Sequence, residues 1–217
     1  GVSAPLTIRS DANETERSFT GLDAVPVEIE AVSEFLPGPV LLNDRFTPQA
    51  LARTMSQTRF SVAHLATHAT FGRTAADSFL LAYGADGASG SKITLDDLEA
   101  FSTQARIRGE PIELLTLSAC ETGVGDPNAE SETASLGLAG VAFKAGSRSV
   151  LESLCQVYDD STLDLMIEFY GRLIPDQSSD AVSKAQALRQ AQLTLLVDNE
   201  TDHPAHWAAF ILYGNWL

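Results

Sequence analysis

The stretch IELLTLSAC, residues 112–120, decides the fold of this chain. Its apolar part, Ile112–Leu117, has the length and composition of a strand buried on both faces. The stretch FSVAHLAT, Phe60–Thr67, has the same character earlier in the chain. Cys120 follows the first run closely, and His68 follows the second. Because reactive groups collect at the carboxyl ends of strands in open α/β sheets, these two strand ends form the candidate site.

Helix and strand patterns alternate through the rest of the chain. The spacing of apolar residues and the stop signals predict helices over 25–36, 48–57, 95–104, 134–145, 161–173 and 181–197, and strands over 40–42, 78–83, 148–154 and 207–213. Gly84–Gly90 (GADGASG) has the composition of a turn, and residues 1–24 are polar and predicted to be irregular. Strands that alternate with helices predict an α/β fold with a mostly parallel sheet and helices on both faces.

Length and composition bound the class of protein. A chain of 217 residues, 44% of them hydrophobic, can build one domain with its own buried core. Two cysteines are too few for a disulfide framework, which favours a reducing, cytoplasmic setting. No window reaches the ~18 continuous apolar residues of a membrane helix, and the start at Gly1 shows neither a signal peptide nor an initiator Met. A processed or truncated chain is therefore expected.

The charge of the chain limits its partners. It carries 29 Asp and Glu against 14 Lys and Arg, a formal net charge of −15 at pH 7. A surface of this sign repels nucleic-acid phosphates and anionic lipid, so we expect neither nucleic acid nor membrane as a direct partner. Cationic groups, including peptides that contain Arg or Lys, would be attracted instead.

A thiol and an imidazole from neighbouring strand ends are the minimum for a cysteine nucleophile. Free cysteine has a pKa of about 8.5, and an adjacent histidine can take over its proton. The alternative is structural, because a buried cysteine is usually a small apolar residue and a strand-end histidine is usually part of the scaffold. The side chains that could also ligate zinc are His64, His68, Cys120 and Cys155. Their spacing matches no common zinc pattern, so we expect no metal and a structural role for His64.

Two motifs surround the candidate residues: VAHLATH, residues 62–68, and LSACETG, residues 117–123. Together they resemble the paired signature of CHAT-domain peptidases, which are caspase-like cysteine proteases of the clan that also contains the separases. Three later stretches resemble the same family: 137–150 (GLAGVAFKAGSRSV), 153–162 (SLCQVYDDST) and 203–210 (HPAHWAAF). The resemblance runs from about Leu22 to Leu217 and implies a caspase-like three-layer fold.

The resemblance implies a cysteine endopeptidase that cleaves protein or peptide substrates and uses no cofactor. Cys120 would attack the scissile carbonyl, and His68 would assist by proton transfer to the leaving amine. The backbone N–H groups of Cys120 and Ala69 would hold the oxyanion. The family usually has glycine where this chain has Ala69, and alanine can serve unless that position requires a positive φ.

The resemblance also implies a specificity pocket in the turn before residue 161. In separases an Asp of this turn recognises a basic side chain, and Asp159, with Asp160 beside it, falls at that place. Cleavage after Arg, or less often after Lys, is therefore expected. The alternative is an ordinary pair of charges at a helix N-terminus. Cys155 replaces the usual Trp, which implies a wider or remodelled pocket, and Tyr158 is expected to refill part of that space.

The expected organisation is an irregular segment over 1–24 followed by a caspase-like peptidase domain over 25–217. This domain would be the C-terminal part of a longer protein, with an upstream repeat region or an activating partner. Two other functions stay open at this point. One is a non-proteolytic interaction or regulatory module with the same fold, and the other is a different thiol enzyme, such as an acyltransferase or an amidase.

Overall fold

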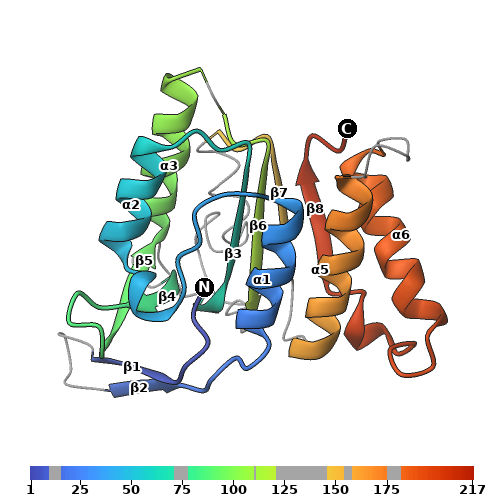
Figure 1. Ribbon diagram of the computed structural model, residues 1–217, viewed down its shortest axis with the longest axis horizontal. Helices are drawn as coiled ribbons and strands as arrows, with labels where there is room; N and C mark the ends of the chain where they lie inside the picture. The colour runs from blue at the N-terminus through green and yellow to red at the C-terminus, as the bar shows by residue number, and fades with distance from the viewer. Residues whose placement is uncertain (10–15, 71–77, 110, 121–145, 154–157, 175–181) are drawn as a thin grey trace, which may run out of the picture.

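Both apolar runs form central strands of one six-stranded sheet (Figure 1). The computed structural model describes residues 1–9, 16–70, 78–109, 111–120, 146–153, 158–174 and 182–217. The strands are β1 (Leu6–Arg9), β2 (Glu16–Phe19), β3 (Val62–Thr70), β4 (Phe79–Tyr83), β5 (Gly90–Thr94), β6 (Leu114–Cys120), β7 (Ser149–Ser153) and β8 (Phe210–Gly214). The helices are α1 (Val25–Phe35), α2 (Pro48–Gln57), α3 (Leu95–Ile107), α5 (Asp159–Leu173) and α6 (Lys184–Val197), with short 3-10 turns η1 (Asn43–Arg45) and η3 (Pro204–His206). The helix predicted over 134–145 lies outside the described residues.

The sheet has the strand order β5-β4-β3-β6-β7-β8 and is mixed. Of its five described pairings, β3 with β6 and β6 with β7 are parallel, and the other three are antiparallel. The prediction of a mostly parallel sheet is therefore wrong. One cause is a tight hairpin between β4 and β5, in which the N–H of Gly84 donates to the carbonyl of Ser89 at 2.8 Å. Gly87 takes a φ of 67° in this turn, and strands joined so closely must run antiparallel.

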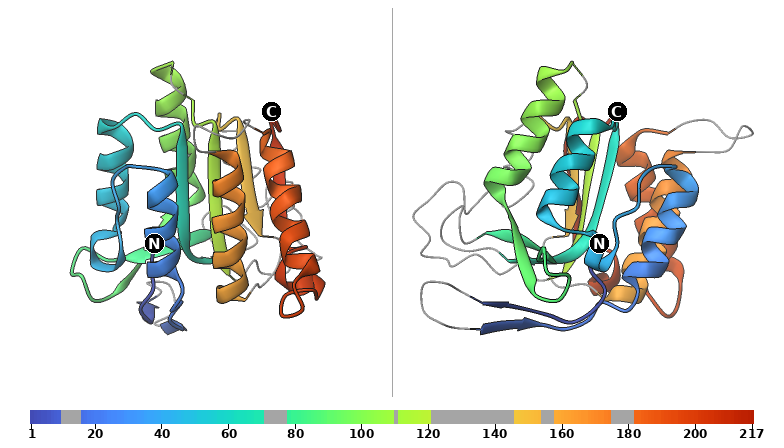
Figure 2. Two further views of the ribbon diagram at one scale, coloured as in Figure 1. Left: turned by 45° about the vertical axis from the view of Figure 1, so that its right-hand side comes forward. Right: turned by 60° about the vertical axis from the view of Figure 1, so that its left-hand side comes forward.

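Helices cover both faces of the sheet (Figure 2). α2 and α3 lie on one face, and α1, α5 and α6 lie on the other, as the right-hand view shows. The predicted N-cap of α2 is confirmed, because the Thr47 hydroxyl accepts the N–H of Ala50 at 3.1 Å. The predicted capping box before α3 is also present, since the N–H of Thr94 donates to the Asp97 carboxylate at 2.8 Å.

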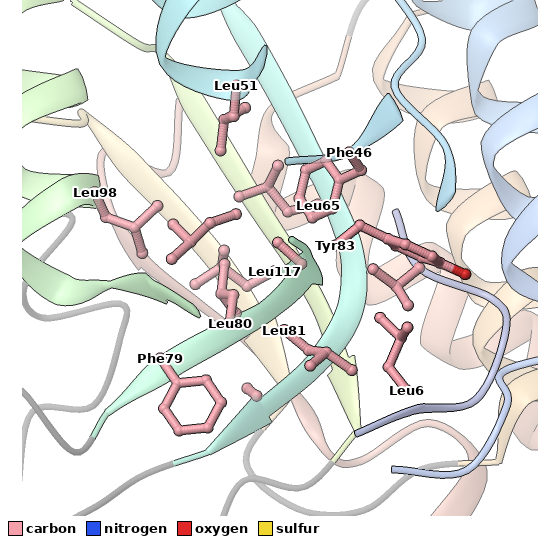
Figure 3. Packing of buried hydrophobic residues seen from close by; sticks show 14 of the residues in the cluster. Leu6, Phe46, Leu51, Leu65, Phe79, Leu80, Leu81, Tyr83, Leu98 and Leu117 are labelled. Atoms are coloured by element: carbon pink, nitrogen blue, oxygen red, sulfur yellow. The ribbon is translucent and has the colours of Figure 1, made fainter. Parts of the chain in front are cut away.

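Each face of the sheet has its own hydrophobic core. The cluster under α2 and α3, part of which Figure 3 shows, includes Leu65, Leu80, Ile93, Leu117 and Val150. The cluster under α1, α5 and α6 includes Leu151, Leu165, Phe169, Tyr170 and Phe210. β3, β6 and β7 contribute residues to both clusters, so side chains pack against both faces of these strands and fix the positions of their ends.

Two short segments differ from their sequence predictions. Residues 1–24, predicted to be irregular, contain β1 and β2, which pair antiparallel with Leu6 opposite Phe19. Leu6, Ile8 and Phe19 are buried, but strands of four residues are too short to give a clear alternation in the sequence. Residues 40–42, which the structure describes, form no strand; the chain turns instead into η1, where Asn43 has a φ of 53°.

Candidate active site

The backbone register places His68 and Cys120 next to each other. β3 and β6 are parallel, and their pairing runs from Val62 with Leu114 to His68 with Cys120. Neighbouring strands lie about 4.8 Å apart, and paired positions belong to the same face of a sheet. Both residues stand at the carboxyl ends of their strands, at the lower edge of the sheet in Figure 1. Two residues that are far apart in the sequence therefore lie side by side at one edge of the sheet.

The imidazole of His68 is buried and held in one orientation. It is 5% exposed, and its Nε2 lies 2.8 Å from the carbonyl oxygen of Thr20. Because a carbonyl can only accept a hydrogen bond, Nε2 carries a proton. Nδ1 is buried as well and has no hydrogen-bond partner among the described residues. In its neutral form this histidine therefore presents Nδ1 as a proton acceptor.

The β1-β2 ribbon supplies the contacts that hold His68. The ring of Phe19 packs against the imidazole, with 5.4 Å between the ring centroids and 42° between the planes. The guanidinium carbon of Arg17 lies 4.8 Å from the centroid of the same Phe19 ring. Sequence reasoning missed both Phe19 and Thr20. A backbone carbonyl has no sequence signature, and a single apolar residue in a polar stretch gives only a weak signal.

Gly90 lets this ribbon lie close to the sheet. A Cβ atom at Gly90 would stand 2.8 Å from Cγ1 of Ile8 and 3.0 Å from the carbonyl oxygen of Thr7. Both distances are shorter than normal contacts, so only glycine fits this backbone approach without a shift of the ribbon. β1 therefore packs closely against β5, and Thr20, which contacts His68, directly follows β2 of the same ribbon.

Ala69, the second expected oxyanion donor, lies within β3. It is 1% exposed, and it pairs in register with Leu80 of β4. Among the described residues Asn43 is the only one other than glycine with a positive φ, so Ala69 has an ordinary strand conformation. The Cβ of Ala69 therefore introduces no backbone strain at this position.

The residues expected to form the specificity pocket lie at the start of α5 or just before it. Asp159 and Asp160 are the first two residues of this helix, and Asp160 is exposed. Tyr158 is 60% exposed and stacks on His206 of η3, with 4.8 Å between the ring centroids. Cys155 lies outside the described residues. The described part of this region thus presents an aromatic pair next to a negatively charged helix end.

Negative charge is concentrated along α5. Burial, together with the charges of Asp160, Asp198 and Glu168, raises the pKa of the Asp164 carboxyl above its usual value. Clustered negative charges attract cationic groups from solution. The described part of α5 therefore carries a surplus of negative charge near its amino-terminal end.

A cavity of about 320 Å³ lies away from the strand ends that carry His68 and Cys120. It opens between α1 and α2 at the amino-terminal half of β3, and its walls include Val32, Leu36, Leu51, Met55 and Val62. Because the candidate residues stand at the other end of β3, this cavity does not form part of their site.

The fold and the paired strand ends define a class of protein: an α/β domain with a histidine and a cysteine at adjoining carboxyl ends of parallel strands. Over residues 2–215, essentially its whole length, the chain matches the family model of the CHAT domain. The chain therefore belongs to the CHAT-domain family, which is caspase-like and related to proteases. A comparison with curated proteins gave no match.

None of the helices in the described ranges is long and apolar enough to cross a membrane. In the same part of the chain, no three His, Cys, Asp or Glu side chains gather in an arrangement that could hold a metal ion.

Proposed function

We propose that this CHAT domain is a cysteine endopeptidase of caspase-like fold, with Cys120 as the nucleophile and His68 as the acid–base. The observation that carries the proposal is the register that pairs the two residues at the ends of β3 and β6. Membership of a protease-related family supports the same assignment. The substrates are proteins or peptides.

The orientation of His68 supports a role in proton transfer. With Nε2–H donated to the Thr20 carbonyl, Nδ1 is the nitrogen that takes the thiol proton. The Cys120 thiolate then attacks the scissile carbonyl carbon and forms a C–S bond, and the resulting oxyanion is held by backbone N–H groups. We assign these donors to Cys120 and Ala69, since neither requires a side chain for this purpose.

Breakdown of the tetrahedral intermediate completes acylation. The C–N bond breaks, the imidazolium returns its proton to the leaving amine, and a thioester remains on Cys120. Water then hydrolyses the thioester, which releases the carboxylic acid and restores the thiol. The Thr20 carbonyl stabilises the imidazolium while it exists, because a positively charged ring donates a stronger hydrogen bond than a neutral one.

The proposed specificity is for Arg, and less strongly for Lys, before the scissile bond. Asp159 is the proposed partner of the guanidinium, with Asp160 beside it. Support comes from the negative charge along α5 and from the exposed Tyr158 ring, because an aromatic face and a carboxylate both attract a planar cation. The stack of Tyr158 on His206 would form one wall of the pocket.

A labelling experiment tests the nucleophile directly. The purified protein is incubated with an acyloxymethyl ketone that carries Arg, and the modified residue is located by mass spectrometry. We expect a label on Cys120 in the unaltered protein and in Cys155→Ala, which is the matched control thiol. Cys120→Ala and His68→Ala should lose the label and the cleavage of an Arg-ended fluorogenic peptide, while thermal unfolding shows that both variants are folded.

Three results would decide against parts of this proposal. Equal cleavage by a clean Cys120→Ala preparation removes Cys120 from the mechanism. A folded protein with no labelling and no cleavage favours an interaction or regulatory module instead of an enzyme. An Arg preference that is unchanged in Asp159→Asn removes Asp159 from the specificity pocket.

A further inference from the structure

Four buried polar side chains form a hydrogen-bonded chain beneath the candidate site. Nε2 of His64 lies 3.1 Å from Oε1 of Glu28, and Nδ1 of His64 lies 3.1 Å from the hydroxyl of Tyr170. The same hydroxyl lies 2.7 Å from Oγ1 of Thr116. The four residues come from α1, β3, α5 and β6, so one chain of hydrogen bonds joins two strands of the sheet to two of the helices on one face.

All four side chains are buried, so each polar group depends on its hydrogen-bond partner. The side chains of Glu28 and His64 are each 4% exposed, and Thr116 and Tyr170 are fully buried. A buried polar group without a partner is costly, so each group holds its neighbour in place. Burial raises the pKa of the Tyr170 phenol, which therefore keeps its proton and can donate and accept at once.

The position of the chain relates it to the candidate site. His64 pairs in register with Thr116, and His68 pairs with Cys120 four residues further along the same two strands. Four residues span about 13 Å, and an even spacing keeps both pairs on one face of the sheet. A slip of one residue would move position 116 away from Tyr170 and position 120 to the opposite face.

We propose that Glu28, His64, Tyr170 and Thr116 form a positioning array, which fixes the register of β3 against β6 and thereby sets His68 beside Cys120. Glu28 orients the His64 ring through Nε2, and Tyr170 then ties that ring to Thr116. His64 and Thr116 lie four residues before His68 and Cys120, so the array would act through the strands and not on the substrate itself. The relevance of the array to catalysis rests on the proposed peptidase function, whereas its effect on the strand register does not.

Substitutions that remove one hydroxyl test the array. Tyr170→Phe removes the hydroxyl that joins His64 to Thr116 and leaves the ring in place. The matched control is Tyr83→Phe, which removes the hydroxyl of a buried tyrosine in the other core cluster. A second pair acts at Thr116: Thr116→Val removes the hydroxyl at constant shape, and Thr116→Ser keeps it.

Two readouts separate positioning from general stability. The first is amide hydrogen exchange at residues 66–68 and 118–120, which reports the pairing of the strand ends directly. We expect faster exchange there in Tyr170→Phe and Thr116→Val, and wild-type exchange in Tyr83→Phe and Thr116→Ser. The second is labelling of Cys120 by the Arg ketone, where the maximal rate should fall about tenfold in the first two variants with unchanged affinity for the probe, because small misplacements of reacting groups cost rate.

The outcomes distinguish the two proposals. If the unaltered protein takes no label, the peptidase function fails, and the exchange data alone decide on the array. Exchange at the strand ends that is the same in Tyr170→Phe and Tyr83→Phe overturns the positioning role. If Thr116→Ser behaves like Thr116→Val, the hydroxyl is not the relevant group, and the array is overturned as well.

Discussion

Replacing Gly90 by alanine tests whether the packing of the β1-β2 ribbon against β5 determines the orientation of the His68 ring. The new Cβ would lie 2.8 Å from Cγ1 of Ile8, whereas ordinary contacts begin near 3.4 Å. A change in the Ile8 side chain can relieve this contact, but the Thr7 carbonyl oxygen is only 3.0 Å away, so the ribbon backbone must move outward by about 0.4 Å (3.4 − 3.0). A shift of this size along the hydrogen bond from His68 to Thr20 would lengthen it from 2.8 Å to about 3.2 Å, the upper limit of the usual range of 2.7–3.2 Å.

Two energies oppose each other in this variant. Removal of a glycine from a strand lowers the entropy of the unfolded chain and stabilises the fold by about 0.5–1 kcal/mol. Overpacking at a tight backbone contact costs about 1–3 kcal/mol. The second effect is larger, so we expect Gly90→Ala to lose about 1 kcal/mol of the free energy of unfolding, measured in urea.

The assay that connects this shift to the site is the nitrogen NMR spectrum of the His68 ring. In the unaltered protein Nε2 should carry the proton, and in Gly90→Ala the two tautomers should both be populated. The control is Gly38→Ala, because the nearest atom to a Cβ there is 4.0 Å away. A Gly90→Ala protein with wild-type stability and an unchanged tautomer would refute the argument that this close approach positions Thr20.

Two further predictions concern α5. Because the pKa of Asp164 is raised in the folded protein, the contribution of this carboxyl to stability falls as pH rises through the raised pKa. Asp164→Asn should therefore increase the melting temperature at pH 7 but not below the usual Asp pKa of about 3.9. Thermal scans of the control variant, Glu99→Gln at an exposed position of α3, should show no such pattern. Phe169→Ala should lose about 3–5 kcal/mol in urea unfolding because the ring is fully buried, whereas Leu193→Ala, at 40% exposure, should lose less than about 0.5 kcal/mol.

The central strands and several helix starts could be predicted from the sequence. β3 and β6 contain runs of consecutive apolar residues, and such a run indicates a buried strand without any information on which strands lie beside it. α2 matches its predicted range of 48–57, because a threonine N-cap and a proline at the first helical position are local signals. The placement of His68 and Cys120 at strand ends follows from the same two runs.

The edges of the fold could not be predicted in this way. β5 has only one fully buried apolar residue, Ile93, and β1 is four residues long, so neither gives a clear period. The direction of β4 depends on how it pairs with β3 at Ala69 and Thr70, which is a long-range contact without a local signature. The Thr20 carbonyl was missed for a related reason, since its partner His68 is 48 residues away.

The register between β3 and β6 has a consequence during synthesis. His68 and Cys120 are separated by 52 positions, and the hairpin of β4 and β5 and the helix α3 lie between them in the chain. Closing a loop of this length costs roughly 3.5 kcal/mol of chain entropy, which is recovered only when the strands pair. A nascent chain on the ribosome therefore holds its thiol and its imidazole apart until residue 120 has emerged and the sheet has closed, so under the proposed function the partly made protein would have no assembled site.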